Sequence, residues 1–178
     1  MQNNYEDQIW DDAGESNNEY GYIGNPNEYY VNNFTADVTI MDACFWEYAS
    51  QKQTFFEGLK KFLIDSGRKI TILTKTYQEI HNRSVCDENS AFRKRSAERL
   101  IEEFADAKVV VMGQRIFDAH SAEKSSTFLQ FVLECIEKNI PCAALVGDLK
   151  SRVILKYKVK QKAEKEPCNV KIITPDQI

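Results

Sequence analysis

Acidic side chains follow the apolar segments of this sequence at the points where predicted strands end. Asp42 comes directly after the first apolar run, and Asp148 comes one residue after a later run. Glu79, Asp118 and Glu123 follow two further runs. Because ligands of open parallel sheets bind outside the carboxyl ends of the strands, we expect these carboxylates to face one crevice.

A group of carboxylates in one crevice suits a divalent cation. Acids that converge repel each other and raise one another's pKa values unless a cation joins them. Mg2+ and Mn2+ prefer hard oxygen ligands of this kind together with water. Such an ion lowers the pKa of a bound water and stabilises the charge that develops on a phosphodiester during transfer. The alternative is that the acids are helix N-caps and solvated loop residues, and the spacing alone leaves both interpretations open.

Several other catalytic chemistries are disfavoured by the motifs. The sequence contains neither G-x-G-x-x-G nor G-x-x-x-x-G-K-[ST], and only four glycines follow residue 36, so a phosphate-cradling loop is disfavoured. The serine elbow G-x-S-x-G is also missing from the sequence. A phosphoaspartate hydrolase would have a second Asp two residues after the first, where this chain has Cys44. Cys44 could act as a nucleophile, but a cysteine beside a buried strand is more often inert packing.

The elements that must position these acids alternate regularly from residue 37 onward. Short apolar runs between amphipathic segments are typical of parallel strands that helices cover on both faces. The expected fold class is α/β, a three-layer α/β/α sandwich with a central, mostly parallel five-stranded sheet. Strands are predicted over 37–42, 69–74, 108–112, 142–146 and 169–173, and helices over 54–66, up to Glu79, over 89–105, over 121–139 and over about 149–165.

The N-terminal part differs in composition and charge. Residues 1–35 hold eight Asn, five Tyr and seven acids without helical or strand periodicity, so we expect an extended or disordered acidic arm, followed by one domain over 36–178. Residues 1–51 contain ten Asp or Glu and no Lys or Arg, whereas residues 52–178 carry a net charge of +6. The first segment would repel nucleic acid, and the second could attract it.

Cysteine usage and hydropathy predict a cytoplasmic protein. The five cysteines are odd in number and never form C-x-x-C, which fits a reducing compartment. With only two histidines, a structural zinc site is disfavoured. The first ten residues are acidic and polar, unlike a secretory signal. The sequence has no apolar run of about 18 residues, the length that a membrane span requires.

Three segments of the chain resemble motifs of the PIN-domain (PIN-like) family of metal-dependent ribonucleases, and the resemblance covers about residues 37–174, essentially the whole predicted domain. The segment 38–44 is similar to the family's opening strand with its first metal-binding Asp, although the family usually has Asn or Ser where this chain has Cys44. The segment 74–80 is similar to the second motif, in which a Glu lies on a short helix. The segment 145–152 is similar to the fourth, in which an Asp follows an apolar strand and an Arg comes four residues later.

The third motif of that family is an Asp in the first turn of the helix before the fourth strand. Glu123 is the nearest acid to that window, in a helix predicted to begin near Ser121, and Asp118 is the alternative. The resemblance thus implies a catalytic set of Asp42, Glu79, Glu123 and Asp148, and a metal site formed by Asp42, Asp148 and Glu123 or Asp118.

The function that the resemblance implies is an endoribonuclease that cleaves single-stranded RNA by hydrolysis at a carboxylate-bound Mg2+ or Mn2+ ion. Asp42 and Asp148 would hold the ion, and Glu79 with Glu123 would orient its waters. Basic residues in two places are candidates for phosphate contacts, although a solvated charged helix surface explains them as well. They are Lys150, Arg152, Lys156, Arg93 and Arg95.

Two other hypotheses stay open from the sequence. One is a PIN-like module with an incomplete site that binds RNA or a protein partner without cleavage, which Cys44 and the position of the third acid favour. The other concerns residues 1–35, which would lie over the basic surface as an acidic mimic of nucleic acid or dock on a protein partner. A homo-oligomer is compatible with either hypothesis.

Overall fold

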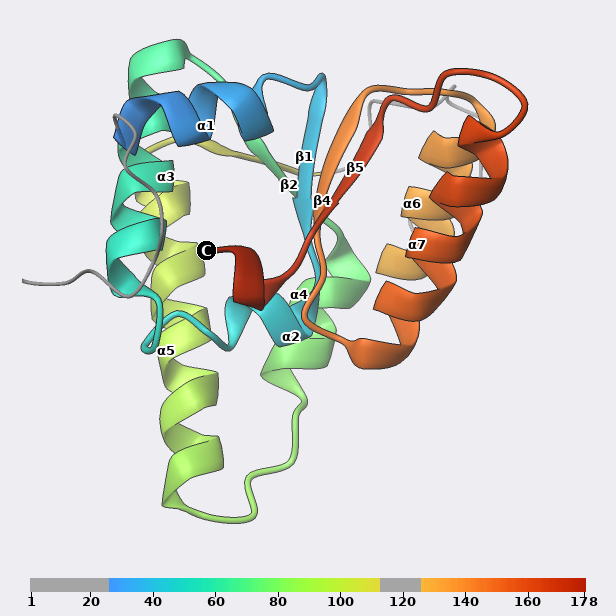
Figure 1. Cartoon of the computed structure of the whole chain (residues 1–178). Coiled ribbons are helices and arrows are strands. Elements are labelled where there is room, and N and C mark those ends of the chain that lie inside the picture. Colours follow the sequence, from blue (N-terminus) through green and yellow to red (C-terminus); the bar gives the residue numbers. More distant parts are fainter. Residues whose placement is uncertain (1–25, 113–125) are drawn as a thin grey trace, which may run out of the picture.

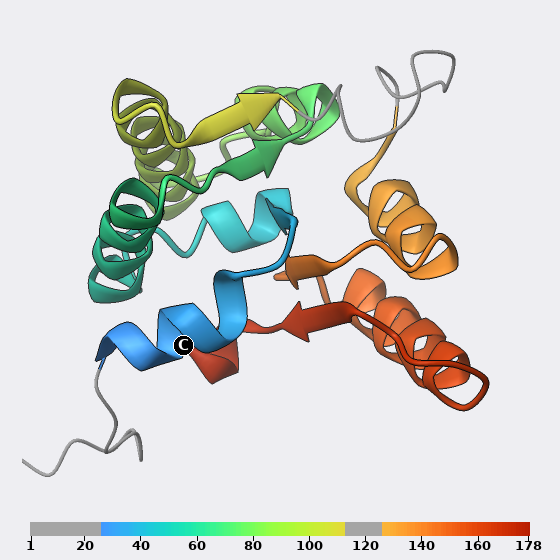
Figure 2. The ribbon, with the colours of Figure 1, turned by 90° about the horizontal axis from the view of Figure 1, so that it is seen from above.

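The chain forms a parallel sheet between two layers of helices. The computed structural model describes residues 26–112 and 126–178, and within them five strands form one sheet in the order β3-β2-β1-β4-β5, with every neighbouring pair parallel (Figures 1 and 2). The predicted three-layer α/β/α fold is confirmed. The strands are β1 (Val38–Met41), β2 (Ile70–Ile72), β3 (Val110–Met112), β4 (Cys142–Leu145) and β5 (Val170–Ile173).

Helices lie before, between and after these strands. Most of them follow the predicted segments closely, because their apolar residues pack toward the sheet. Four of the described helices begin after a residue whose side chain caps the first turn, namely Asp42, Asp87, Thr127 and Asp148. Their bounds are α1 (Pro26–Phe34), α2 (Ala43–Trp46), α3 (Gln53–Ser66), α4 (Thr74–His81), α5 (Glu88–Asp106), α6 (Phe128–Glu137) and α7 (Leu149–Ala163), and a 3-10 turn covers Pro175–Gln177.

The apolar runs form strands because both faces of the sheet are covered. Successive side chains of a strand point to opposite faces. In β1, Val38 and Ile40 therefore enter the core below α6 and α7, whereas Met41 enters the core below α3 and α5. In β4, Ala144 and Leu145 are divided between the two cores in the same way.

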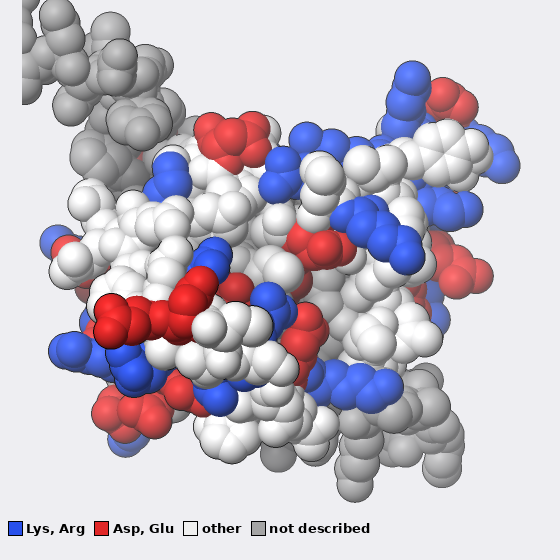
Figure 3. Space-filling view, turned by 90° about the horizontal axis from the view of Figure 1, so that it is seen from below, with Lys and Arg blue, Asp and Glu red and all other residues white. Residues whose placement is uncertain are grey.

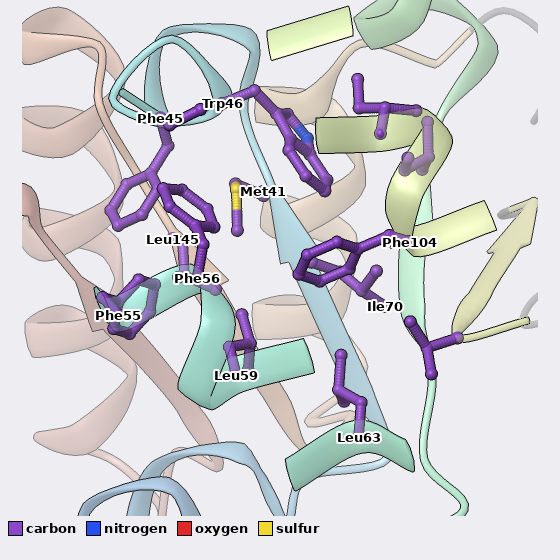
Figure 4. Close-up of a cluster of buried hydrophobic side chains, with 14 of the residues drawn as sticks. Met41, Phe45, Trp46, Phe55, Phe56, Leu59, Leu63, Ile70, Phe104 and Leu145 are labelled. Atoms are coloured by element: carbon purple, nitrogen blue, oxygen red, sulfur yellow. The ribbon is translucent and has the colours of Figure 1, made fainter. Parts of the chain in front are cut away.

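The larger core is aromatic and fills the layer formed by α1, α2, α3 and α5 (Figure 4). Trp46 meets Phe104 edge-on, with ring centroids 5.6 Å apart, and stacks on Phe56 at 6.3 Å. All three side chains are buried. Their packing fixes α2 against α3 and α5, and thereby fixes the segment that follows Asp42.

The opposite layer is built from α6 and α7 alone among the described helices. The buried side chains of α6 include Phe131, Val132 and Cys135, whereas Leu155 is the one residue of α7 that is buried. The five cysteines are free, and Cys135 and Cys142 are fully buried as small apolar side chains. None of the described helices has the length and apolar character needed to cross a bilayer.

Helix α1 corrects the predicted boundary of the N-terminal arm. The polar composition places residues 26–34 in that arm, but they form a helix that packs on α3. Phe34 is fully buried, and the Tyr30 hydroxyl donates a hydrogen bond to the Phe55 carbonyl at 3.0 Å. A Cβ on Gly58 would lie 2.2 Å from that hydroxyl, so glycine lets α1 approach. Aromatic packing thus outweighs a polar composition, and residues 1–25 lie outside the described part.

Candidate functional site

The candidate site lies at the carboxyl edge of the sheet. The chain leaves β1, β2 and β4 there and enters α2, α4 and α7, all at the same end of the sheet (Figure 1). The strand order reverses between β1 and β4, because β2 and β3 follow on one side and β5 on the other. Such a switch point is where open α/β sheets commonly bind ligands. Acidic and basic side chains are interspersed over this face (Figure 3).

The side chain of Asp42 closes the switch point. It is 5% exposed and caps α2, with Oδ1 accepting a hydrogen bond from the Phe45 amide at 2.6 Å. The amide of Gly147 donates to Oδ1 at 3.0 Å and to Oδ2 at 2.9 Å. The amide of Asp148 donates to Oδ2 at 2.9 Å. One carboxylate therefore joins the end of β1 to the turn between β4 and α7.

These contacts use the hydrogen-bonding capacity of Asp42. An ionised carboxylate has about four lone-pair sites, and the Asp42 oxygens make four contacts with backbone amides. Burial raises the pKa of this carboxyl, while the amides of Asp148, Gly147 and Phe45 oppose the increase. A cation bound at Asp42 would have to displace at least one amide.

A glycine is required at position 147, because the backbone there lies very close to the start of α2. A Cβ at this position would lie 2.5 Å from the Phe45 nitrogen, 2.6 Å from the Cys44 carbonyl carbon and 2.9 Å from the Cys44 Cβ. Two of these three atoms belong to backbone, which cannot swing aside as a flexible side chain can. The turn after β4 therefore needs a residue without a side chain to bring its amide onto Asp42.

Asp148 caps α7, as the N-cap alternative predicts for an acid after a strand. Its Oδ2 accepts a hydrogen bond from the Ser151 amide at 2.8 Å. The hydrogen bonds from Ser151 lower the pKa of the Asp148 carboxyl, and Lys150 and Arg152 lower it further. The charges of Asp148 and Asp42 repel, which contributes to the raised pKa of Asp42. The two acids thus lie close together, as predicted, but each also has a structural role.

An arginine lies between Glu47 and Glu79 at the same edge of the sheet. Arg83 follows α4, and its Nε lies 2.9 Å from Glu47 Oε1 while its Nη2 lies 3.0 Å from Glu79 Oε1. Glu47 comes immediately after α2, and burial raises the pKa of its carboxyl against the opposing effect of Arg83. A guanidinium thus supplies the positive charge that converging carboxylates require.

The Cys44 thiol lies beside this ion pair and is not poised as a nucleophile. Its Sγ is 4.0 Å from Arg83 Nη2. Burial raises the pKa of the thiol to about 11, with a further increase from the charge of Asp42. Since the thiolate is the reactive form, the thiol is protonated at neutral pH. The geometry supports the packing interpretation of Cys44.

The predicted basic residues are distributed over two sides of the edge. Arg152 reaches back to the site, where its Nη2 donates to the Gly147 carbonyl at 3.5 Å and its Nη1 pairs with Asp176 at 3.7 Å. Arg93 is close enough to Glu47 to lower the pKa of that carboxyl. The remaining three side chains, Lys150, Lys156 and Arg95, are exposed.

The described residues do not fit a divalent ion. Residues 26–112 and 126–178 contain no group of three His, Cys, Asp or Glu side chains that could hold a metal. Asp42 is occupied by amides, and Glu79 is paired with Arg83. Glu123 and Asp118 fall in 113–125, outside the described part. Helix α6 begins at Phe128 with Thr127 as its N-cap, so its first turn does not contain Glu123, contrary to the prediction.

Two residues of the site were missed by the sequence analysis. Arg83 stands four residues after Glu79, a spacing that forms ion pairs on a helix and could have been noticed. Glu47 follows no strand and carries no comparable signal. An open cavity of about 270 Å3 lies beside Glu79, between α4 and the start of α6. Its lining residues are Lys75, Thr76, Gln78, Glu79, Asn82, Thr127 and Phe128.

Comparisons with known proteins identify no relative of this chain. No family model, no curated protein and no solved structure matches it.

Proposed function

We propose that this chain is a PIN-like module that binds single-stranded RNA along α7 and the adjoining carboxyl edge without cleaving it. The observation that carries the proposal is the distribution of charge. At the edge, acids are neutralised by Arg83 or bonded to backbone amides. On α7, six Lys or Arg occur within fifteen residues that include no acid.

The state of the acids supports a binding function without cleavage. Phosphodiester hydrolysis at such a site would need an ion or a base with a free lone pair near the bound phosphate. The oxygens of Asp42 are occupied, and Glu79 is engaged by Arg83. The protonated Cys44 thiol offers no alternative nucleophile.

Binding is supported by side chains of the two kinds that recognise single strands. Lysines neutralise phosphates and release counterions, whereas an exposed aromatic ring offers a surface on which a base can stack. Lys156, Lys158 and Lys160 are exposed, and Tyr157 between them is 58% exposed. Asp148 is the N-cap of this helix, so the helix starts at the candidate site.

The test is the salt dependence of binding to a labelled, unstructured RNA, measured by fluorescence anisotropy. The variant K156Q/K158Q/K160Q should lose about tenfold or more in affinity, and the slope of log K against log salt should become less negative by about 2. The matched control K61Q/K69Q/K108Q removes three exposed lysines elsewhere and should retain wild-type binding. Equal losses in both variants, or no RNA binding at all, would refute the proposal.

A second function, metal-dependent RNA hydrolysis, is favoured by one observation. Asp42, Glu79 and Asp148 lie on elements at one edge, and the segment 113–125 carries two more acids. Cleavage of end-labelled RNA in Mn2+ should then occur with wild type and be lost in Asp148→Asn, because Asn preserves the helix cap. Glu134→Gln on α6 is the control. RNA that stays intact in wild type supports the first proposal.

A further inference from the structure

An apolar stripe runs along the exposed side of α7. Leu149, Val153 and Tyr157 are spaced four residues apart, which places them in one row on a helix. Their exposed fractions are 68%, 62% and 58%. We call these three residues the outer stripe of α7. Leu155, on the other side of the helix, is fully buried against the α6 layer.

Lysines and an arginine flank the outer stripe. The helix contains Lys150, Arg152, Lys156, Lys158, Lys160 and Lys162 and no acid. Arg152 and Lys162 make ion pairs, with Asp176 and Glu166 respectively. A ligand that covers the outer stripe must therefore combine apolar or aromatic groups with several negative charges.

One segment of the chain has this composition. Residues 1–25 contain six acids and no Lys or Arg, so their side-chain charge of −6 is opposite to the +6 of α7. The same segment carries Trp10, Tyr5, Tyr20 and Tyr22. Ile9 and Trp10 have acids on both sides in the sequence, with Asp7 two residues before Ile9 and Asp11 directly after Trp10. Residues 1–25 are therefore complementary to α7 both in charge and in apolar side chains.

The segment is long enough to reach α7. It precedes α1, which packs in the layer on the other side of the sheet from α7 (Figures 1 and 2). Helix and sheet layers are each about 10 Å thick. Trp10 stands sixteen residues before Pro26, and a chain of that length spans up to about 50 Å when extended. Three such layers add up to about 30 Å, which is shorter than this span.

We infer that residues 1–25 bind the outer stripe of α7 in the same molecule, with Ile9 and Trp10 on the apolar row and the flanking acids against the lysines. The contact restrains nucleic-acid binding, because the segment and RNA occupy the same cations. This last point rests on the proposed function, whereas the contact itself does not. The ligand is thus a peptide of the chain's own sequence in which aromatic residues stand next to acidic ones.

The contact is tested by zero-length carbodiimide cross-linking of the full chain at low concentration, followed by mass spectrometry of the monomer. Acids of residues 6–19 should join lysines of α7 at least fivefold more often than they join Lys61, Lys69 or Lys108, which are exposed elsewhere. The variant L149S/V153S/Y157S should lose this preference. The control I64S/V85S removes apolar side chains of similar exposure and should keep it.

Three cross-linking results would overturn the inference. The first is an even distribution over exposed lysines, and the second is a preference that survives the outer-stripe variant. The third is that cross-links to α7 form only between molecules.

The affinity for RNA provides an independent test of the contact. The variant W10A/D11N/D12N should bind labelled RNA about three- to tenfold more tightly at low salt, and less so as salt screens both contacts. If cross-links to α7 form while no variant binds RNA, the proposed function fails and the intramolecular contact stands. If RNA binds but the cross-links are evenly spread, the contact fails and the proposed function stands.

Discussion

The backbone amide of Asp148 donates a hydrogen bond to the Asp42 carboxylate at 2.9 Å. The two acids that follow strands β1 and β4 are therefore linked through the main chain of one and the side chain of the other. With the Gly147 amide, this contact holds the two strand ends together at the switch point of the sheet. Asp42 thus stabilises the geometry of the site in addition to contributing its charge.

Replacing Asp42 by Asn should destabilise the fold. An amide side chain accepts through one oxygen only, and its NH2 group would face backbone donors that the carboxylate now satisfies. We expect the free energy of unfolding to fall by roughly 2–4 kcal/mol in urea denaturation. Asp65→Asn, an exposed position on α3, is the control and should change stability by less than about 0.5 kcal/mol. A stable Asp42→Asn variant would contradict the structural role.

Adding one methyl group at Gly147 should have a comparable effect through a different cause. The new Cβ would overlap the backbone of Phe45 and Cys44, so the turn must move away from Asp42. Overpacking of this kind costs about 1–3 kcal/mol, and the loss of the amide contacts adds to it. Gly67→Ala, at a helix end with φ of 67° and open space around it, isolates the smaller effect of backbone strain. The comparison is made by thermal or urea unfolding.

Acid should remove the stabilising contribution of Asp148. Hydrogen bonds from Ser151 lower the pKa of this carboxyl below its ordinary value of 3.8, so the ionised form is favoured in the folded state. The contribution is complete above the unfolded-state pKa and is lost as the pH falls through the lower, folded-state pKa. The stability difference between wild type and Asp148→Asn should therefore shrink below about pH 4. A difference that does not change with pH would count against this account.

Removing Arg83 should expose a binding site for divalent cations. In Arg83→Met, Glu47 and Glu79 lose the guanidinium that lies between them. Mn2+ should then bind more tightly than to wild type, by about tenfold in titrations followed by electron paramagnetic resonance, since two acids without a counterion attract a cation. The double variant R83M/E47Q should return to wild-type affinity. Tight Mn2+ binding to the wild-type chain would favour the hydrolase instead.

Alkylation rates should distinguish the Cys44 thiol from an exposed one. Burial raises the pKa of Cys44 to about 11, whereas Cys86 is exposed. At pH 8, iodoacetamide should therefore modify Cys86 at least tenfold faster, as peptide mass spectrometry can follow. Faster modification of Cys44 would revive its interpretation as a nucleophile.

The sheet could be predicted because buried parallel strands are continuous apolar runs. Val38–Met41 and Cys142–Leu145 are buried at every position, so neither segment could be mistaken for a solvated loop. Helix α1 could not be predicted in this way. Its residues are mostly polar, and its stability depends on Tyr30 packing on Phe62 and Phe34 packing on Phe55, which follow them in the sequence by 32 and 21 positions.

The roles of the acids could be predicted only in part. An Asp after an apolar strand has the same local pattern whether it binds a metal or caps a helix. The Gly147 amide, which decides between these roles for Asp42, is 105 residues away in sequence and meets it only because β1 pairs with β4. The ion pair between Arg83 and Glu47 has no local signal for a similar reason, because Glu47 lies 36 residues earlier.

The four contacts made by Asp42 have a consequence for the interpretation of sequence conservation. No other side chain places four acceptor sites on so short a stem, because Asn offers two and Glu is longer by one methylene. Selection for folding alone would therefore retain aspartate at this position and glycine at 147. In relatives of this chain, an invariant Asp at the end of the first strand would be evidence for the hydrogen bonds that join this strand to the turn after β4. It would not, by itself, be evidence for catalysis.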